Sequence, residues 1–187
     1  MKVRLFAALE IPKDILEQLI EIRKSLYDDE KLKWEGIDKL HITIKFFGDV
    51  FENQIEQINK KLNNITNNYL RVLGSFTNFG LFYRNNHPAI LWAGLEATQK
   101  IVSLHKEINY SMYKLGFQKE VRNFKPHITL LRLKGKEDIH KIYKFNNYKI
   151  DINNFYFESI KLFKSELTRS GSVYSEINEF ISRKNQL

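Results

Sequence analysis

The sequence contains no cysteine, and it has no apolar run long enough to cross a membrane. The first absence excludes disulfides and thiolate metal ligands, and it fits a cytoplasmic protein. A transmembrane helix needs about 18 consecutive apolar residues, so we expect no membrane span. The opening residues 1–6 hold too short an apolar stretch for a signal peptide and are typical of a strand. Because linkers and low-complexity tracts are also missing, we expect residues 1–187 to form a single domain.

What the sequence does contain is ordinary for a soluble globular protein. Hydrophobic residues make up 43% and charged residues 28% of its 187 residues, enough for a sizeable core. The formal net charge of +8 favours a polyanionic partner, and nucleic acid in particular. The abundance of Lys, Asn and Ile would also follow from an AT-rich genome, so charge alone leaves the partner open. We expect the protein to act as a monomer.

One short motif occurs twice. His41-Ile42-Thr43-Ile44 recurs 86 positions later as His127-Ile128-Thr129-Leu130. Alternate side chains of a strand share a face, so each His points the same way as its Thr, and the apolar residues point the opposite way. Each motif therefore predicts a strand with a buried back that offers one imidazole and one hydroxyl to a cleft.

The repeat extends beyond the motif. With the same 86-residue shift, Leu5-Phe6-Ala7-Ala8-Leu9 aligns without a gap on Leu91-Trp92-Ala93-Gly94-Leu95. We interpret this as an internal duplication of approximately residues 3–83 and 89–169. Two similar lobes related by a pseudo-twofold axis would place the two His-Thr strands opposite each other.

Periodicity and turn residues predict an α+β fold with two lobes. Gly48 and Asp49 are expected to end the first His-Thr strand. The expected helices cover residues 12–26, 55–65, 98–115 and a short segment near 136–145. The expected strands cover residues 3–9, 40–47, 89–95 and 127–133, one or two further strands within 69–83, and a closing hairpin of 154–167 and 173–180.

Paired imidazoles suit acid–base chemistry on a phosphate. Opening a cyclic phosphodiester needs a base that activates water and an acid that protonates the departing oxygen, and imidazoles with pKa values near ~6.5 can share these tasks. The Thr hydroxyls can donate hydrogen bonds to phosphate oxygens. Two other interpretations remain: an ordinary strand surface, or a metal site, although neither strand carries the Asp, Glu or Cys ligands that would accompany His.

Four stretches of the chain resemble the two-histidine (2H) phosphoesterases, which are named for paired His-x-Thr/Ser motifs on a bilobal fold. Among them, the chain looks like the RNA 2′,3′-cyclic phosphodiesterases, historically called 2′-5′ RNA ligases. The stretches are residues 3–12, 34–50, 124–132 and 162–167, the last followed by Gly171 and Tyr174, and they span nearly the whole chain in the family's order.

The resemblance implies a mechanism. Water attacks the phosphorus of a terminal RNA 2′,3′-cyclic phosphate and O3′ leaves, which gives a 2′-phosphate without a metal or other cofactor. His41 would be the proton donor and His127 the proton acceptor, with Thr43 and Thr129 beside them. The duplication makes the two imidazoles near equivalents, so the sequence alone does not rank them.

Arg132 matches a family position implicated in phosphate binding. Strand parity, however, places it on the face opposite His127, so it reaches the phosphate only if the strand bends or ends near Leu131. Lys45 has the correct parity beside Thr43, but it could equally be a solvated rim lysine. Trp34 and Phe46 are candidates for stacking on a base, and His105 is expected to be a packing or surface histidine.

Two alternatives to hydrolysis stay open at this point. The same acid and base would serve the reverse reaction, a 2′-5′ ligation of RNA ends. A non-catalytic RNA-binding module would use the basic surface alone, but simple binding would not need His and Thr in both motifs.

Overall fold

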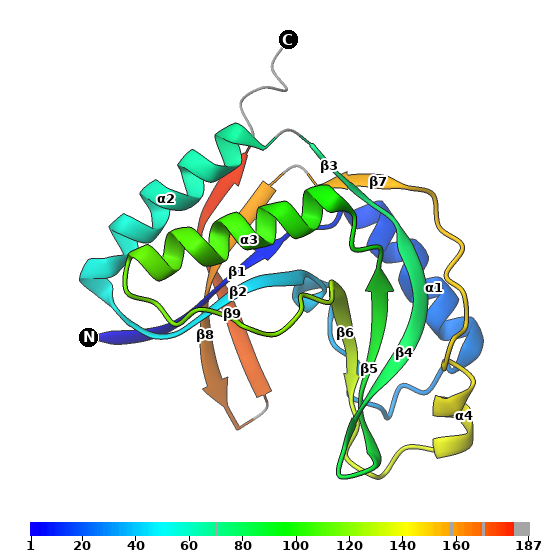
Figure 1. The fold of residues 1–187 in the computed structure, drawn as a ribbon. Helices are drawn as coiled ribbons and strands as arrows, with labels where there is room; N and C mark the ends of the chain where they lie inside the picture. The colour runs from blue at the N-terminus through cyan, green and yellow to red at the C-terminus, as the bar shows by residue number, and fades with distance from the viewer. Residues whose placement is uncertain (70, 158, 170, 182–187) are drawn as a thin grey trace.

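The computed structural model describes residues 1–181 except 70, 158 and 170, and shows an α+β fold of two main antiparallel sheets (Figure 1). One sheet has four strands in the order β2-β1-β8-β9, another has three in the order β4-β5-β6, and β3 pairs with β7. The strands are β1 Lys2–Leu9, β2 Ile42–Phe51, β3 Val72–Gly74, β4 Phe76–Arg84, β5 His87–Leu95, β6 His127–Arg132, β7 Phe155–Phe157, β8 Ser159–Thr168 and β9 Gly171–Ile181.

The helices cover the outer faces of the sheets. α2 and α3 lie over the four-stranded sheet, whereas in the view of Figure 1 α1 and α4 are seen on the β4 side of the three-stranded sheet. The helices are α1 Lys13–Leu26, α2 Ile55–Asn68, α3 Gln99–Lys114 and α4 Ile139–Tyr143, with 3₁₀ turns at Ile37–Lys39 and Glu52–Gln54. None of the described helices is long and apolar enough to cross a membrane.

Local sequence explains where the long helices begin and end. Pro12 directly precedes α1, and its fixed φ is compatible with a helix start. The Thr98 hydroxyl accepts a hydrogen bond from the Ile101 N–H and caps the start of α3. Gly116, with φ +91°, follows the end of α3 in the left-handed conformation that terminates many helices.

The two halves of the sequence contribute matching units, but each gives one strand to the other's sheet. β1, α1 and β2 form a strand–helix–strand unit, and β5, α3 and β6 form a second one. β8 from the second half then pairs with β1, and β4 from the first half pairs with β5. The halves proposed from the sequence are therefore not the two sheets, and the duplication itself remains a prediction.

The expectation that β2 ends at Gly48 is wrong. β2 continues to Phe51, and its pairing with β1 shifts register at this point, from Phe6 opposite Phe46 to Leu5 opposite Gly48. Gly48 has φ +72°, a left-handed conformation that fits a β-bulge. The glycine thus bends the strand and does not terminate it.

Replacing Gly48 with alanine should lower the free energy of unfolding by about 1 kcal/mol, because an L side chain at positive φ is strained. A Cβ at this position would meet no atom within 4 Å, so the cost would come from the backbone alone. Denaturant unfolding at one pH measures it. Gly48→Asn is the matched control and should cost less, since Asn tolerates the left-handed region. Equal stability of Gly48→Ala and the wild type would contradict the bulge.

Candidate active site

A cleft of about 980 Å³ lies between the two main sheets. β2 and β6, one strand from each sheet, approach each other with Cα atoms within 8 Å. The cleft is also bordered by residues of β1, β8 and β9, and by the α3–β6 loop, residues 115–126. Both His-Thr motifs thus belong to the edges of one hollow.

The structure places all four residues of the His-Thr pairs on the lining of this cleft. His41 directly precedes β2 and Thr43 lies within it, while His127 begins β6 and Thr129 follows two residues later. The residues between and after them face the core, with exposures of 0% for Ile42 and Ile128, 1% for Ile44 and 2% for Leu130. Burial of these apolar faces fixes the direction in which the polar faces point.

Each His-Thr strand has a bulge directly after its threonine. In β2, Thr43 pairs with Ala8 of β1 and Lys45 pairs with the adjacent Ala7, so one extra residue of β2 lies between the two pairs. In β6, the neighbours Trp92 and Leu91 pair with Thr129 and Leu131. A bulge of this kind reverses the parity of the residues that follow it, up to the next bulge.

The bulge in β6 brings Arg132 into the cleft. Simple alternation would send Arg132 to the far face, but Leu130 and Leu131 are both buried and Arg132 lines the cleft with His127. Its Nε lies 3.3 Å from a carboxylate oxygen of Glu35, a cleft residue that the sequence did not single out. A guanidinium oriented in this way could contact a phosphate oxygen.

The bulge in β2 exchanges the faces of Lys45 and Phe46, relative to simple alternation. Lys45, the possible rim lysine, is only 1% exposed and lies on the core face, so the rim interpretation is wrong. Phe46 takes the position equivalent to Arg132 and is 66% exposed on the cleft lining. The two sides of the cleft therefore present an aromatic ring and a cation at matching positions.

The imidazole of His41 lies in an aromatic cage. It stacks on Phe6 with ring centroids 5.0 Å apart and on Phe163 at 5.6 Å, and Tyr174 meets it edge-on at 5.5 Å. Its Nδ1 is buried without a hydrogen-bond partner among the described residues. Burial in these surroundings lowers the pKa of His41 from 6.5 to about 4, so the imidazole of the free protein is neutral at pH 7.

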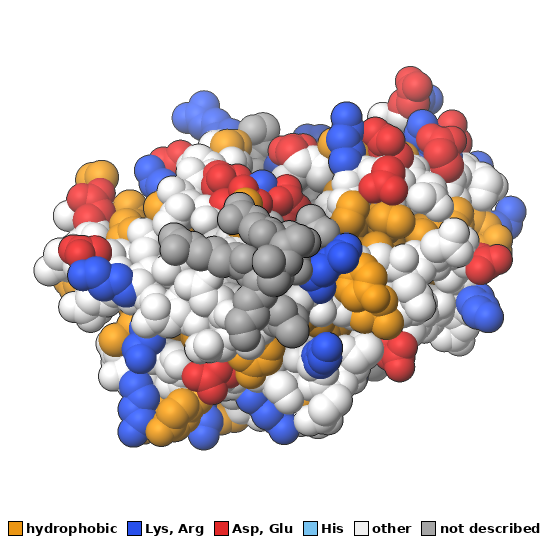
Figure 2. Space-filling model, turned by 90° about the horizontal axis from the view of Figure 1, so that it is seen from above, with side chains coloured by type: hydrophobic (Ala, Val, Ile, Leu, Met, Phe, Trp, Pro, Cys, Tyr) orange, Lys and Arg blue, Asp and Glu red, His pale blue; other side chains and the backbone are white. Residues whose placement is uncertain are grey.

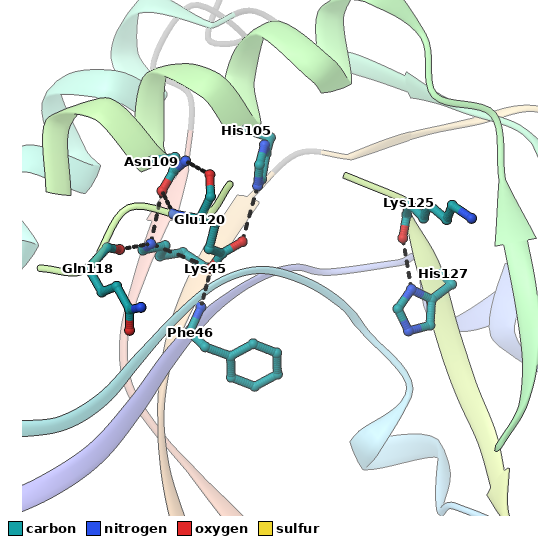
Figure 3. Close-up of polar contacts among 8 residues, drawn as sticks. All are labelled: Lys45, Phe46, His105, Asn109, Gln118, Glu120, Lys125 and His127. Atoms are coloured by element: carbon teal, nitrogen blue, oxygen red, sulfur yellow. Dashed lines mark hydrogen bonds and ion pairs between the residues drawn. The ribbon is translucent and has the colours of Figure 1, made fainter. Parts of the chain in front are cut away.

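His127 has a more polar setting. Its Nδ1 donates a hydrogen bond to the carbonyl oxygen of Lys125 at 2.8 Å (Figure 3), which leaves the lone pair of the neutral ring on Nε2. Burial lowers the pKa of His127, the bond to Lys125 opposes this, and the nearby charge of Arg132 adds to the lowering. A neutral imidazole with a free Nε2 is suited to accept a proton.

Some candidates from the sequence lie elsewhere. Trp34 packs against Tyr27 and Phe145 and donates through Nε1 to the carbonyl of Asp29, so it is not part of the described cleft lining. His105 is 5% exposed and packs against Phe124, as expected of a packing histidine. The aromatic cage of His41 was missed because its members are spread over three strands without a local pattern.

Cations outnumber acids on the cleft lining. On the described lining, two carboxylates, Glu35 and Glu120, face five basic side chains besides the buried Lys45, which are Arg4, Lys39, Arg122, Lys125 and Arg132. In Figure 2, which looks from above, Lys and Arg are interspersed with Asp and Glu and form no continuous basic surface on that face. Within the described part of the chain, no three His, Asp or Glu side chains are grouped as a metal site.

Comparison with known proteins shows the family. The model of the family described as LigT like Phosphoesterase matches residues 9–92 and 95–174, so the chain belongs to the LigT-like phosphoesterases of the 2H superfamily. The chain is 32% identical over 185 residues to the RNA 2′,3′-cyclic phosphodiesterase of Methanocaldococcus jannaschii, covering 95% of this chain and all of that one. It is 29% identical to the protein of the same name from Aquifex aeolicus, covering 95% and 96% of the two chains.

Solved structures show the same fold at lower sequence identity. A protein of Thermus thermophilus superposes with a TM-score of 0.83 at 22% identity, over 96% of this chain and 98% of that one. LigT of Escherichia coli superposes in its apo form with a TM-score of 0.79 at 21% identity, over 97% and 98%. The α+β architecture expected from the sequence is thereby confirmed.

The two imidazoles should titrate separately, as NMR of the ring protons against pH can measure. We expect a midpoint near pH 4 for His41 and a higher midpoint, still below 6.5, for His127. Arg132→Gln should raise the pKa of His127, because removing a cation favours the imidazolium, and should leave His41 unchanged. An unshifted His127 in this variant would contradict the placement of Arg132 beside it.

Proposed function

We propose that this protein hydrolyses the 2′,3′-cyclic phosphate end of RNA to a 2′-phosphate, with His41 and His127 as acid and base. The observation that carries the proposal is that both His-Thr pairs line one cleft, from matching positions on two sheets. The name of the relatives, RNA 2′,3′-cyclic phosphodiesterase, supports the same substrate. A monomeric state and a cytoplasmic location stay predictions from the sequence.

His127 is the proposed base. Its Nδ1–H is held by Lys125, so the Nε2 lone pair is available to take a proton from the attacking water. The pKa below 6.5 keeps most of this imidazole neutral at pH 7. As the water oxygen bonds to phosphorus and the bond to O3′ breaks, the proton of the water moves to Nε2.

His41 is the proposed acid, and it must be protonated to give a proton to O3′. Burial among the aromatic rings disfavours that state, because it lowers the pKa to about 4. A phosphate anion beside the ring would raise the pKa, since an opposite charge stabilises the imidazolium. Substrate binding would thus charge His41 at the moment the acid is needed.

Thr43, Thr129 and Arg132 are the proposed phosphate ligands. All three line the cleft with the two imidazoles. The hydroxyls can donate to the non-bridging oxygens, and the guanidinium adds a fixed positive charge where negative charge accumulates in the transition state. This scheme needs no metal ion.

His41→Ala and His127→Ala should each lower turnover by about 10²–10⁴, the usual contribution of a general acid or base. Thr43→Ala and Thr129→Ala should lower turnover less, because the equivalent hydroxyl on the other strand would remain. RNA affinity should survive in the His variants, since phosphate contacts with basic residues dominate binding. The measurement is kcat and the RNA dissociation constant on the same protein at one salt concentration.

His87→Ala is the matched control for these variants. His87 begins β5, is exposed and lies outside the described cleft lining, so its loss should change neither turnover nor binding. If His41→Ala and His127→Ala abolished RNA binding but kept the rate at saturating substrate, the residues would be binding groups. The alternative of a non-catalytic RNA-binding module requires that the wild type show no turnover.

A further inference from the structure

Lys45 is a buried cation that the chemistry above does not use. It lies on the core face of β2 with an exposure of 1%. An isolated ammonium in such a place would be very costly, so its charge must be matched by partners. The positions of those partners show which segments of the chain the lysine connects.

The ammonium of Lys45 contacts three groups (Figure 3). Its Nζ donates to Asn109 Oδ1 at 2.9 Å and to the carbonyl oxygen of Gln118 at 2.7 Å. It also lies 3.5 Å from Glu120 Oε1. Asn109 belongs to α3, whereas Gln118 and Glu120 belong to the α3–β6 loop, so the lysine joins that loop to the strand that carries Thr43.

Glu120 makes further contacts in the same network through both its side chain and its backbone. Its carboxylate accepts the backbone N–H of Phe46 at 3.3 Å and lies 3.4 Å from His105 Nε2. Asn109 brackets its backbone, accepting the N–H of Glu120 at 2.9 Å and donating to its carbonyl at 2.8 Å. Burial alone would raise the pKa of Glu120, but the contacts with His105, Lys45 and Phe46 hold it below its ordinary value.

These contacts fix a length of loop that forms part of the cleft wall. We call residues 118–124 the wall segment. Its far end is held by Phe124, whose ring stacks on His105 with centroids 4.2 Å apart. The segment places Arg122 and Asn123 on the cleft lining.

The lysine is not needed to fill space. Leu131 is the equivalent of Lys45 at the bulge of β6, and it is also 1% exposed. A leucine therefore satisfies the packing at this position of a His-Thr strand, without the desolvation cost of a charge. What the lysine adds is its set of polar contacts, and two of the three lead to the wall segment.

His127 is anchored separately. It pairs with Gly94 of β5, and the N–H of Leu95 donates to the carbonyl of Pro126 at 3.1 Å. Loss of the lysine network should therefore move the wall segment while leaving the imidazole in place. Binding and chemistry are expected to respond differently.

We propose that Lys45 is a positioning residue that, through Glu120 and Asn109, holds the wall segment 118–124 against β2 so that Arg122 and Asn123 face the RNA. The identity of the substrate rests on the function proposed above. The lysine acts through the loop and does not touch the reacting phosphate.

The test compares Lys45→Met with Lys60→Met. Methionine keeps the length and apolar stem of lysine but removes the charge; Lys60 is an exposed residue of α2 paired with Glu56, so its substitution is the matched control. For an RNA ending in a 2′,3′-cyclic phosphate, Lys45→Met should raise KM about tenfold, the size of losing hydrogen bonds to a charged group, and change kcat less than about threefold. Lys60→Met should change neither.

Glu120→Gln keeps the shape of the side chain and an acceptor for the Phe46 N–H, and it should also raise KM. Because both residues belong to one network, the double variant Lys45→Met with Glu120→Gln should raise KM by less than the product of the two single increases. If Lys45→Met fails to fold, as judged by thermal melting, Glu120→Gln carries the test. Folded variants with wild-type KM, or a fall in kcat alone, would overturn the proposal.

Amide hydrogen exchange separates this proposal from the proposed function. Residues 118–124 should exchange about tenfold faster in Lys45→Met, or in Glu120→Gln, than in the wild type and in Lys60→Met, because the segment loses its anchors. If the wild type does not open the cyclic phosphate, the proposed function fails, while faster exchange would still support the positioning role. Unchanged exchange in the folded variants would overturn it.

Discussion

The arrangement of the cleft depends on one backbone constraint, the bulge that directly follows the threonine of each His-Thr strand. Without it, strict alternation would put Lys45 in the cleft beside Thr43 and would send Phe46 and Arg132 to the far face. The extra residue in each strand reverses these positions. One local irregularity, present twice, therefore decides which side chains surround the two imidazoles.

The two halves of the cleft are alike in backbone but not in chemistry. His41 is surrounded by Phe6, Phe163 and Tyr174, which remove it from water, whereas His127 donates to a carbonyl and has Arg132 nearby. Burial in the aromatic cage lowers the pKa of His41, and the hydrogen bond to the carbonyl oxygen leaves the lone pair of the neutral His127 ring on Nε2. The surroundings thus distinguish two residues that the sequence presents as equivalents, and they support the proposed assignment of His127 as the base.

Much of this could be predicted from the sequence because it depends on short-range patterns. Alternation of apolar residues predicted the cleft face of both His-Thr strands, and the 3.6-residue period predicted α1 and α3 to within a few residues. The family resemblance rested on the same motifs. Features set by pairing with another strand could not be predicted, since neither the bulge nor the burial of Lys45 has a signal within its own segment. The exchange of β4 and β8 between the sheets likewise depends on long-range pairing.

The proposed reaction is tested most directly by the product formed from an RNA that ends in a 2′,3′-cyclic phosphate, incubated with the protein in EDTA. The two-histidine mechanism predicts hydrolysis without a divalent ion and a product that carries a 2′-phosphate, identified by the position of the phosphate on the terminal ribose. A 3′-phosphate product would contradict the proposed departure of O3′. Turnover that appears only when a divalent ion is restored would contradict catalysis by the two imidazoles alone.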